Sequence, residues 1–356
     1  MKPDFTQKLL DWNNTLNTRQ MPWKGEADPY RIWLSEIILQ QTRVDQGKKY
    51  YLRFIEEFPT IRHLAMAKDE RIYKMWEGLG YYTRCRNLID TARKITNDHK
   101  GIFPDNYEAI RSLKGIGPYT AAAISSFAFN IPVAVVDGNV QRIIARYFGL
   151  STPVDTPPGK KLFAELAQAM LDTENPAIYN QAIMDFGAVI CKPVNPLCTI
   201  CVQQPDCQAY LHGFVNKVPV KEKTITKKSR YLYYFIVRQE SKVYVRKRKE
   251  NDIWQQLHEF ILMETDEPVE DPSLFYEFLH TITAQGTFFI TGISKLFRQQ
   301  LTHQTIQGKF IEVTLSGDVT SIPGYKMVTT KQLKQLAFPG FINTFLATAS
   351  KRSTQQ

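Results

Sequence analysis

Four of the five cysteines in this chain lie close together, between positions 191 and 207. They are Cys191, Cys198, Cys201 and Cys207, with the spacing C-x6-C-x2-C-x5-C. In a reducing compartment such a cluster indicates metal binding rather than disulfide formation. Four thiolates in one short loop can bind either zinc or a [4Fe–4S] cluster, and the spacing by itself leaves both open. Cys85 stands apart, and we expect it to be a small packing residue.

A carboxylate interrupts the apolar run SEIILQQT, residues 35–42. On a helix, the neighbours of Glu36 at three and four positions are largely apolar: Ile32, Trp33, Leu39 and Gln40. Burial disfavours the charged form of a carboxyl, so we expect a raised pKa and a role as general acid. The alternative is a partly exposed glutamate that pairs with a nearby arginine.

A second carboxylate, Asp137, follows four apolar residues in VAVVDGNVQRIIARYFG, residues 133–149, and precedes a predicted helix. An aspartate is a favourable N-cap at such a position. A structural role is therefore the alternative to a role in chemistry.

Two glycines, Gly115 and Gly117, flank an isoleucine in LKGIGPYTAAAI, residues 113–124. Glycines permit a tight turn that points backbone N–H groups at an anion, with the following helix N-terminus behind them. The pattern resembles a helix-hairpin-helix, which binds a DNA phosphate without reading base sequence. G-x-G is equally typical of an ordinary turn between two helices.

Helices must position these residues. We expect residues 1–212 to be mostly helical, with Asp28 as an N-cap before Pro29 at the first helical position. This helical segment is expected to run, with or without a break, to about Phe58. Further helices are predicted near 62–77, 84–99, 106–112, 118–129, 139–148, 159–173 and 176–190.

The character of the sequence changes near residue 213. The stretch NKVPVKEKTITKKSR, residues 216–230, carries six basic residues and one acidic residue. We read 213–230 as a basic linker, either a solvated tether or a segment that contacts phosphates. Beyond it we predict an α+β domain over 231–350. Its expected strands are 231–237 and 242–248, which form a hairpin, and 308–315; its expected helices are near 272–283, 330–336 and 338–349.

The length of 356 residues is enough for two domains. The formal net charge of +10 suggests a polyanionic partner such as nucleic acid, although charge also serves solubility. The N-terminus has no signal-peptide pattern, and no apolar run approaches the length of a membrane span. We therefore expect a cytoplasmic protein with no membrane partner.

Several motifs occur together in one order: SEIILQQTRV, GLGYYTRCRNL, LKGIGPYTAAAISSFAF, VVDGNVQRI, and NQAIMDFGAVIC with the four-cysteine loop. As a set they resemble the adenine DNA glycosylase (MutY) family of helix-hairpin-helix [4Fe–4S] DNA glycosylases, strongly over about 5–212 and more weakly beyond. The resemblance implies a helical catalytic domain over 1–212, with a [4Fe–4S] loop at 191–207, and a Nudix-like domain over 231–350. It implies removal of adenine mispaired with 8-oxoguanine or guanine in double-stranded DNA.

The resemblance also implies roles for individual residues. Glu36 is the acid that protonates adenine, and Asp137 stabilises the oxocarbenium-like sugar, with Asn139 and Tyr119 in support. Glycosylases of this superfamily that also cleave the strand carry a catalytic lysine where this chain has Tyr119. We therefore expect a monofunctional enzyme.

Other residues are implied to contact DNA. Gln41 and Tyr81 resemble the wedge beside 8-oxoguanine, while Gln40 is a less definite pocket residue. Arg19, Trp23 and Gln181 match positions of the adenine pocket, although Trp23 could equally be a core residue.

The second domain lacks the glycine, arginine and glutamate run of a Nudix hydrolase, so we expect it to recognise the 8-oxoguanine strand. Leu301, Thr302 and His303 stand where the family usually has Phe-Ser-His. Thr302 keeps a hydroxyl that could contact the damaged base, but Leu301 cannot stack as phenylalanine would. His303 is alternatively a loop histidine without a ligand.

Three other functions remain open at this point. The first is a glycosylase of the same fold that acts on thymine or an oxidised pyrimidine. The second is a non-catalytic DNA-binding protein that senses redox state, and the third is a zinc-bound structural module. For the preferred reading we expect a nucleoid-associated monomer, with a sliding clamp or a mismatch-repair factor as the candidate protein partner.

Overall fold

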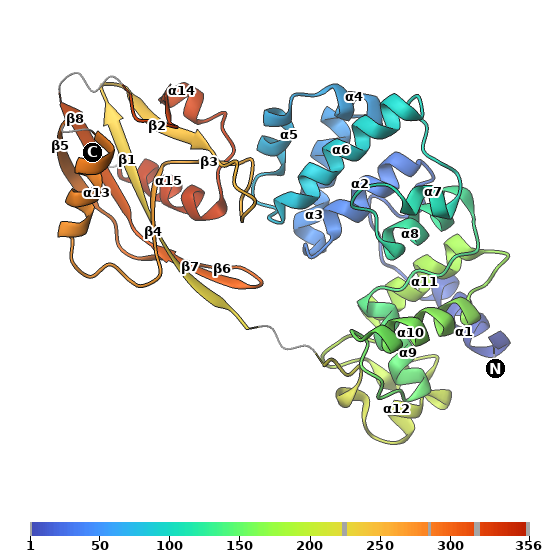
Figure 1. Cartoon of the computed structure of the whole chain (residues 1–356). Helices are drawn as coiled ribbons and strands as arrows, with labels where there is room; N and C mark the ends of the chain where they lie inside the picture. Colours follow the sequence, from blue (N-terminus) through green and yellow to red (C-terminus); the bar gives the residue numbers. More distant parts are fainter. Residues whose placement is uncertain (1, 223–225, 284–285, 317–320, 354–356) are drawn as a thin grey trace. The chain divides into compact units, whose positions relative to one another are not determined.

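The structure is a computed structural model of the chain that describes residues 2–222, 226–283, 286–316 and 321–353 (Figure 1). The chain divides into two compact units. The first unit comprises Met1–Met66 and Arg86–Lys223, and the second comprises Ala67–Cys85 and Thr224–Gln356. An internal segment, Ala67–Cys85, therefore belongs with the C-terminal half of the chain rather than with its sequence neighbours.

The predominantly helical N-terminal region that the sequence predicts is confirmed. Its α-helices are α1 (Lys2–Thr15), α2 (Pro29–Leu39), α3 (Val44–Glu57), α4 (Ile61–Met66), α5 (Asp69–Trp76), α6 (Tyr82–Asp98), α7 (Tyr107–Arg111), α8 (Pro118–Phe129), α9 (Gly138–Phe148), α10 (Pro157–Met170), α11 (Pro176–Val189) and α12 (Gln208–Leu211). Short 3-10 turns follow at Cys198–Ile200, Gln204–Asp206 and Val215–Lys217. No helix in the described part of the chain combines the length and the hydropathy needed to cross a bilayer.

The start of α2 agrees with the sequence, because the Asp28 side chain accepts a hydrogen bond of 2.8 Å from the backbone N–H of Tyr30, and Pro29 is the first helical residue. The chain then breaks between α2 and α3. Gln41 lies in this break with a φ of +54°, a left-handed conformation that no helix interior contains.

The prediction of a single helix near 62–77 is wrong. The structure has two helices there, with α4 ending at Met66 and α5 beginning after Lys68, whose backbone is extended. Asp69 and Glu70 occupy the first turn of α5, where acidic side chains favour a new helix N-terminus.

Helix α8 lies at the centre of the first unit and packs against α2, α7 and α11. Its residues from Thr120 to Ser126 are all buried, and most of them are small. Small side chains allow the neighbouring helices to approach closely, which brings residues of α2, α8 and α11 within reach of one cavity. A second part of this core joins α1 to α11, where the Trp12 and Phe186 rings pack edge to face.

The second unit contains a mixed β-sheet. Among the described residues its strands are β1 (Lys228–Gln239), β2 (Lys242–Lys247), β3 (His258–Glu259), β4 (Ile261–Thr265), β5 (Thr287–Ile293), β6 (Phe297–Gln300), β7 (Gln304–Gly308), β8 (Phe310–Ser316) and β9 (Lys326–Thr329). The long strand β1 pairs antiparallel with β2 and β4 and parallel with β7 and β8. The predicted hairpin of β1 and β2 and the predicted strand at β8 are confirmed. Strands β3, β4, β5, β6, β7 and β9 were not predicted.

Helices cover both faces of this sheet, as Figure 1 shows for α13 (Ser273–Thr283) and α15 (Gly340–Ser353). Consecutive residues of β1 point to opposite faces. Tyr233 packs against Phe275 of α13, and Tyr234 packs against Phe341 of α15. A further short helix, α14 (Thr330–Leu333), follows β9.

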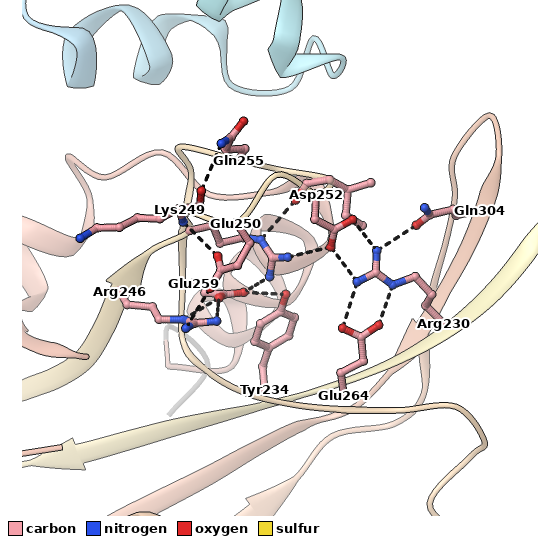
Figure 2. A network of polar contacts seen from close by, with 12 residues as sticks. Arg230, Tyr234, Arg246, Lys249, Glu250, Asp252, Gln255, Glu259, Glu264 and Gln304 are labelled. Carbon is pink, nitrogen blue, oxygen red and sulfur yellow. Dashed lines mark hydrogen bonds and ion pairs between the residues drawn. The ribbon is translucent and has the colours of Figure 1, made fainter. Parts of the chain in front are cut away.

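Charged side chains hold the loop after β2 against the sheet (Figure 2). Arg230 pairs with Asp252 at 2.7 Å and with Glu264 at 2.6 Å. Arg248 pairs with Asp252 at 3.1 Å and with Glu259, whose side chain is completely buried. Because each buried carboxylate has an arginine partner, the network fixes the loop without leaving an uncompensated charge.

The start of the segment read as a linker, as far as Lys223, belongs to the first unit. The backbone N–H of Val154 donates to the carbonyl oxygen of Val220 at 3.0 Å, and that of Glu222 donates to the Asp155 carboxylate at 2.9 Å. Residues 223–225 of the expected linker lie outside the described residues. Strand β1 begins at Lys228.

Candidate active site

A cavity of about 480 Å³ opens in the first unit. It is lined by seven of the residues that the sequence singled out: Arg19, Trp23, Glu36, Tyr119, Asp137, Asn139 and Gln181. They come from the loop after α1 and from helices α2, α8, α9 and α11 and the N-cap of α9. The fold thus brings together side chains that lie far apart along the chain, in a cavity of the size that is typical of small-molecule sites.

Glu36 lies in helix α2 and lines the cavity, and only 7% of its surface is exposed. Burial raises the pKa of its carboxyl to about 7, and the nearby Asp137 adds to the increase. A side-chain hydrogen bond with Tyr119 partly offsets these effects. No arginine contributes to this shift, so Glu36 can carry a proton near neutral pH and release it to a bound molecule.

Asp137 is the N-cap of α9 and also a wall of the cavity. One carboxylate oxygen accepts a hydrogen bond of 2.8 Å from the backbone N–H of Val140. The other oxygen accepts a hydrogen bond of 2.7 Å from the side-chain amide of Asn139. Burial raises the pKa of Asp137, while these hydrogen bonds act in the opposite direction. The capping role and a place in the candidate site are therefore compatible.

Tyr119 stands in the first turn of α8 and lies between two side chains. Its hydroxyl interacts with the Glu36 carboxyl and lies 3.5 Å from the sulfur of Met184. Burial raises the pKa of this phenol well above its ordinary value, and the two nearby carboxyls add to the effect. The tyrosine consequently remains a neutral hydrogen-bonding group.

Arg19 and Gln181 also line the cavity. They are joined by a residue that the sequence analysis did not identify. Asp185 is completely buried and accepts from Arg19 at 2.6 Å and from Gln181 at 3.0 Å. Lys24, also missed, pairs with the same carboxylate at 2.9 Å and lines the cavity. Asp185 lies one helical turn after Gln181, and this i, i+4 spacing was the available signal.

Trp23 both packs against a neighbouring ring and lines the cavity, as its two alternative predictions require. Its ring packs edge to face against Tyr51, with 5.5 Å between the ring centroids, and it lines the cavity. Gln40 is half-buried, and its amide lies 3.4 Å from the Thr120 hydroxyl. Gln41 is exposed in the turn after α2.

A buried arginine connects Asn139 to the cysteine loop. Arg142 donates 2.8 Å hydrogen bonds to the Asn139 side chain and to the backbone oxygen of Gly187. It also donates to the backbone oxygen of Cys191 at 2.7 Å. The sequence reading missed Arg142, because its partners lie up to 49 residues away along the chain.

The four cysteines of the loop are half-buried and form no disulfide. Cys201 interacts electrostatically with the other three thiols, and the Arg146 guanidinium lies 3.4 Å from the sulfur of Cys191. Over the described residues, no three His, Cys, Asp or Glu side chains are arranged around a common point as ligands of a metal ion. The donor set itself, four thiols in one loop beside a cation, fits a cofactor with sulfur ligands such as an iron–sulfur cluster.

The glycine turn joins α7 to α8, so the expected hairpin of two helices is present. Gly115 has a φ of +79°, and a Cβ there would lie 2.7 Å from the Cβ of Asn87. Gly117 has no such constraint, because a Cβ at that position would meet no atom within 4 Å. Glycine at 115 is thus required by the turn, whereas glycine at 117 leaves its backbone accessible.

Tyr81 and the residues of one predicted loop lie in the second unit. Leu301, Thr302 and His303 form the turn between β6 and β7, closed by a 2.8 Å hydrogen bond from the N–H of Leu301 to the oxygen of Gln304. The hydroxyls of Tyr81 and Thr302 form a hydrogen bond. Tyr81 has a φ of +46°, which is unusual for a non-glycine residue. His303 is exposed.

Two protein families match this chain. Residues 34–169 match the HhH-GPD superfamily of base excision DNA repair proteins, and residues 233–348 match the NUDIX domain. The two matches fall on the helical part and on the sheet of the structure, respectively.

Individual proteins resemble the chain more closely. The adenine DNA glycosylase of Buchnera aphidicola subsp. Baizongia pistaciae is 36% identical over 71% of this chain and 72% of its own length. That of Mus musculus is 39% identical over 58% of this chain and 42% of its own length.

Solved structures agree on the fold. A thermostable thymine-DNA glycosylase is 33% identical, with a TM-score of 0.55, and the match covers 58% of this chain and 95% of that protein. An endonuclease III bound to DNA shares the fold at 19% identity, with a TM-score of 0.52 over 60% of this chain and 98% of that one. From the cavity, the two matched domains and these relatives, we conclude that the chain is a DNA glycosylase and belongs to the adenine DNA glycosylase family.

Proposed function

We propose that this chain hydrolytically removes adenine that is mispaired with 8-oxoguanine or guanine in duplex DNA. The observation that carries the proposal is Glu36, a buried carboxyl with a pKa raised to about 7 inside the cavity. A purine leaves its sugar more readily once a ring nitrogen is protonated, and an acid with this pKa holds a proton at neutral pH. The names of the family's members support adenine as the base.

The reaction requires adenine to leave the base stack and enter the cavity. Glu36 then protonates the base, and the bond to the sugar breaks with positive charge developing on the sugar ring. The Asp137 carboxylate stabilises this charge, and Asn139, at 2.7 Å, holds that carboxylate in place. A water molecule adds to the sugar carbon that the base has left and gives up a proton, which leaves an abasic site. Two carboxyl groups in different environments thus take the two different roles.

Two observations support a monofunctional enzyme. Tyr119 occupies the start of α8, and a buried phenol with a raised pKa is a poor nucleophile. Among the described residues that line the cavity, the one lysine is Lys24, and its ammonium pairs with Asp185. An ammonium held by a carboxylate is not free to form a Schiff base with the abasic sugar.

Further residues are proposed to contact DNA. Gly115 and Gly117 present backbone N–H groups to a phosphate. Gln41 and Tyr81 are proposed to fill the space that the flipped base vacates. Thr302 and His303 are proposed to face the 8-oxoguanine strand.

We further propose that Cys191, Cys198, Cys201 and Cys207 hold a [4Fe–4S] cluster. The cluster would serve as a structural link that shapes the loop 191–207 rather than as a reactant. Residues 1–212 would form the catalytic domain and 231–350 the recognition domain, joined by the basic segment 213–230. The protein would act as a monomer at the chromosome, where a sliding clamp or a mismatch-repair factor is the candidate partner.

Thymine removal is the rival function, because a thymine-DNA glycosylase is among the similar structures. Thymine has no imidazole ring nitrogen for Glu36 to protonate. This difference favours adenine.

A single-turnover assay tests the proposal. Duplexes that carry adenine opposite 8-oxoguanine, guanine or thymine, and thymine opposite guanine, are incubated with the wild type and with Glu36→Gln. We expect abasic sites in the adenine strand opposite 8-oxoguanine and guanine, visible only after alkali and lost in Glu36→Gln. Release of thymine, or tight binding without base release, would contradict the proposal.

A further inference from the structure

The buried Asp185 carboxylate accepts hydrogen bonds from four side chains. One oxygen accepts from Arg19 at 2.6 Å and from Gln181 at 3.0 Å. The other accepts from Lys24 and from Asn17, both at 2.9 Å. The Asp185 side chain has no exposed surface, and the two cations compensate its charge.

This arrangement decides which way the Gln181 side chain points. A carboxylate accepts hydrogen bonds and cannot donate them, whereas a glutamine amide has a donor end and an acceptor end. Asp185 therefore engages the NH₂ end of Gln181, which is its Nε2 atom. In the described structure this is the one hydrogen bond of the Gln181 side chain, and the carbonyl oxygen is left for the cavity that Gln181 lines.

The carbonyl oxygen of Gln181 can accept a hydrogen bond from only one group of adenine. The exocyclic amino group at position 6 carries the only hydrogen-bond donors of neutral adenine when the base is attached to its sugar. We infer that Asp185 is a positioning residue for base selectivity, because it orients Gln181 so that a carbonyl oxygen receives this amino group. The inference rests on the proposed function, since it concerns the base that the same cavity takes.

A purely structural role for Asp185 makes a different prediction. If the carboxylate only neutralised Arg19 and Lys24, its loss would disturb the cavity as a whole. The release of any purine would then slow by a similar factor. If it acts through Gln181, its loss lowers the preference for a base that carries the amino group.

The experiment is a double-mutant cycle on the cluster-loaded, full-length protein. Single-turnover release is measured for adenine and for unsubstituted purine, each opposite 8-oxoguanine, because these bases differ only in the amino group. We expect Asp185→Leu, which removes the acceptor at similar side-chain volume, and Gln181→Met each to lower the adenine-to-purine rate ratio by about tenfold, the value of one hydrogen bond. In the double variant the ratio should be no lower than in Gln181→Met alone.

Asn17→Ala is the matched control, because it removes a donor from Asp185 and leaves Gln181 and both cations in place. Its ratio should equal that of the wild type. Three results would overturn the inference: an unchanged ratio in Asp185→Leu, equal falls of the ratio in Asn17→Ala and Asp185→Leu, or additive falls in the double variant. If Asp185→Leu fails to fold, Gln181→Met is decisive. A lowered ratio then supports the acceptor that the inference requires, and an unchanged ratio overturns the inference.

Adenine release by the wild-type protein shows whether a negative result concerns this inference alone or also the proposed function. Adenine release by the wild type with an unchanged ratio in the variants rejects the role of Asp185 only. No adenine release by the folded wild type rejects the proposed function, and the inference with it.

Discussion

The Arg142 guanidinium donates a hydrogen bond of 2.7 Å to the backbone oxygen of Cys191. The same guanidinium holds the side chain of Asn139, which in turn holds the Asp137 carboxylate at 2.7 Å. A continuous path of hydrogen bonds thus joins the cysteine loop to the candidate site. Because one planar group serves several acceptors, the conformation of the loop and the orientation of Asp137 depend on each other.

Arg142→Lys tests this path. A lysine ammonium cannot reproduce the planar fork that reaches all these acceptors. Each buried carbonyl left without a donor costs roughly 1–3 kcal/mol, so we expect a lower melting temperature. We also expect slower adenine release under single-turnover conditions, since Asn139 loses its support. Arg53→Lys, at an exposed position of α3, is the control and should change neither quantity.

Glu36→Gln should stabilise the protein while it abolishes base release. The folded-state pKa of Glu36, about 7, lies above the ordinary value of 4.5, because burial penalises the charged carboxylate. The protonated Glu36 side chain therefore contributes to the free energy of unfolding fully below pH 4.5, and this contribution is lost as the pH rises through 7. Relative to the wild type, the variant should gain on the order of 3 kcal/mol between pH 4.5 and pH 8, measured by urea unfolding. A stability difference that does not change with pH would contradict this prediction.

The rate of adenine release should fall as the pH rises above about 7, because the proposed acid then loses its proton. Tyr119→Phe should move this fall to higher pH. The hydrogen bond from Tyr119 lowers the pKa of Glu36. Without this hydrogen bond, burial should raise the pKa of Glu36 further. Single-turnover rates from pH 5 to pH 9 measure the shift. Tyr147→Phe, at a half-buried tyrosine of α9, should leave the profile unchanged.

Cys198→Ser should lower the yield of folded protein and the affinity for DNA more than it slows the chemical step. The reason is that the proposed cluster shapes a loop and takes no part in the reaction. Visible absorbance reports the cluster, and filter binding reports DNA affinity. Cys85→Ala is the matched control, because Cys85 is buried outside the loop, and it should keep the absorbance. Normal binding with failed chemistry in folded Cys198→Ser would contradict the structural role.

Leu301→Phe should increase the preference for adenine opposite 8-oxoguanine over adenine opposite guanine. Leu301 lies in the turn between β6 and β7, beside the Thr302 hydroxyl that bonds Tyr81. An aromatic ring in this turn could stack on a base, a contact worth about 1–3 kcal/mol. The ratio of single-turnover rates on the two duplexes measures the gain. Leu296→Phe, at an exposed leucine outside this turn, should not change the ratio.

Local patterns in the sequence were sufficient for much of the fold. The N-cap at Asp28, the hairpin of β1 and β2 and the burial of Glu36 all follow from residues within a few positions of one another. Side-chain capping, strand alternation and helical periodicity act over that range, so they can be read directly. The break between α4 and α5 was missed, because the apolar periodicity continues across it while the segment Ala67–Cys85 joins the other unit.

The sequence by itself determined the types of residue in the candidate site: two carboxyls, a tyrosine and four clustered cysteines. Only the tertiary structure decided the burial, the pKa shifts and the hydrogen-bond partners of these residues. Asp185 meets Arg19 across 166 residues of chain, and Arg142 meets Cys191 across 49. Such contacts depend on how helices pack, and packing sets both the burial that raises the pKa of Glu36 and the orientation of the Gln181 amide. No local pattern contains that information, because the partners become neighbours only after the chain has folded.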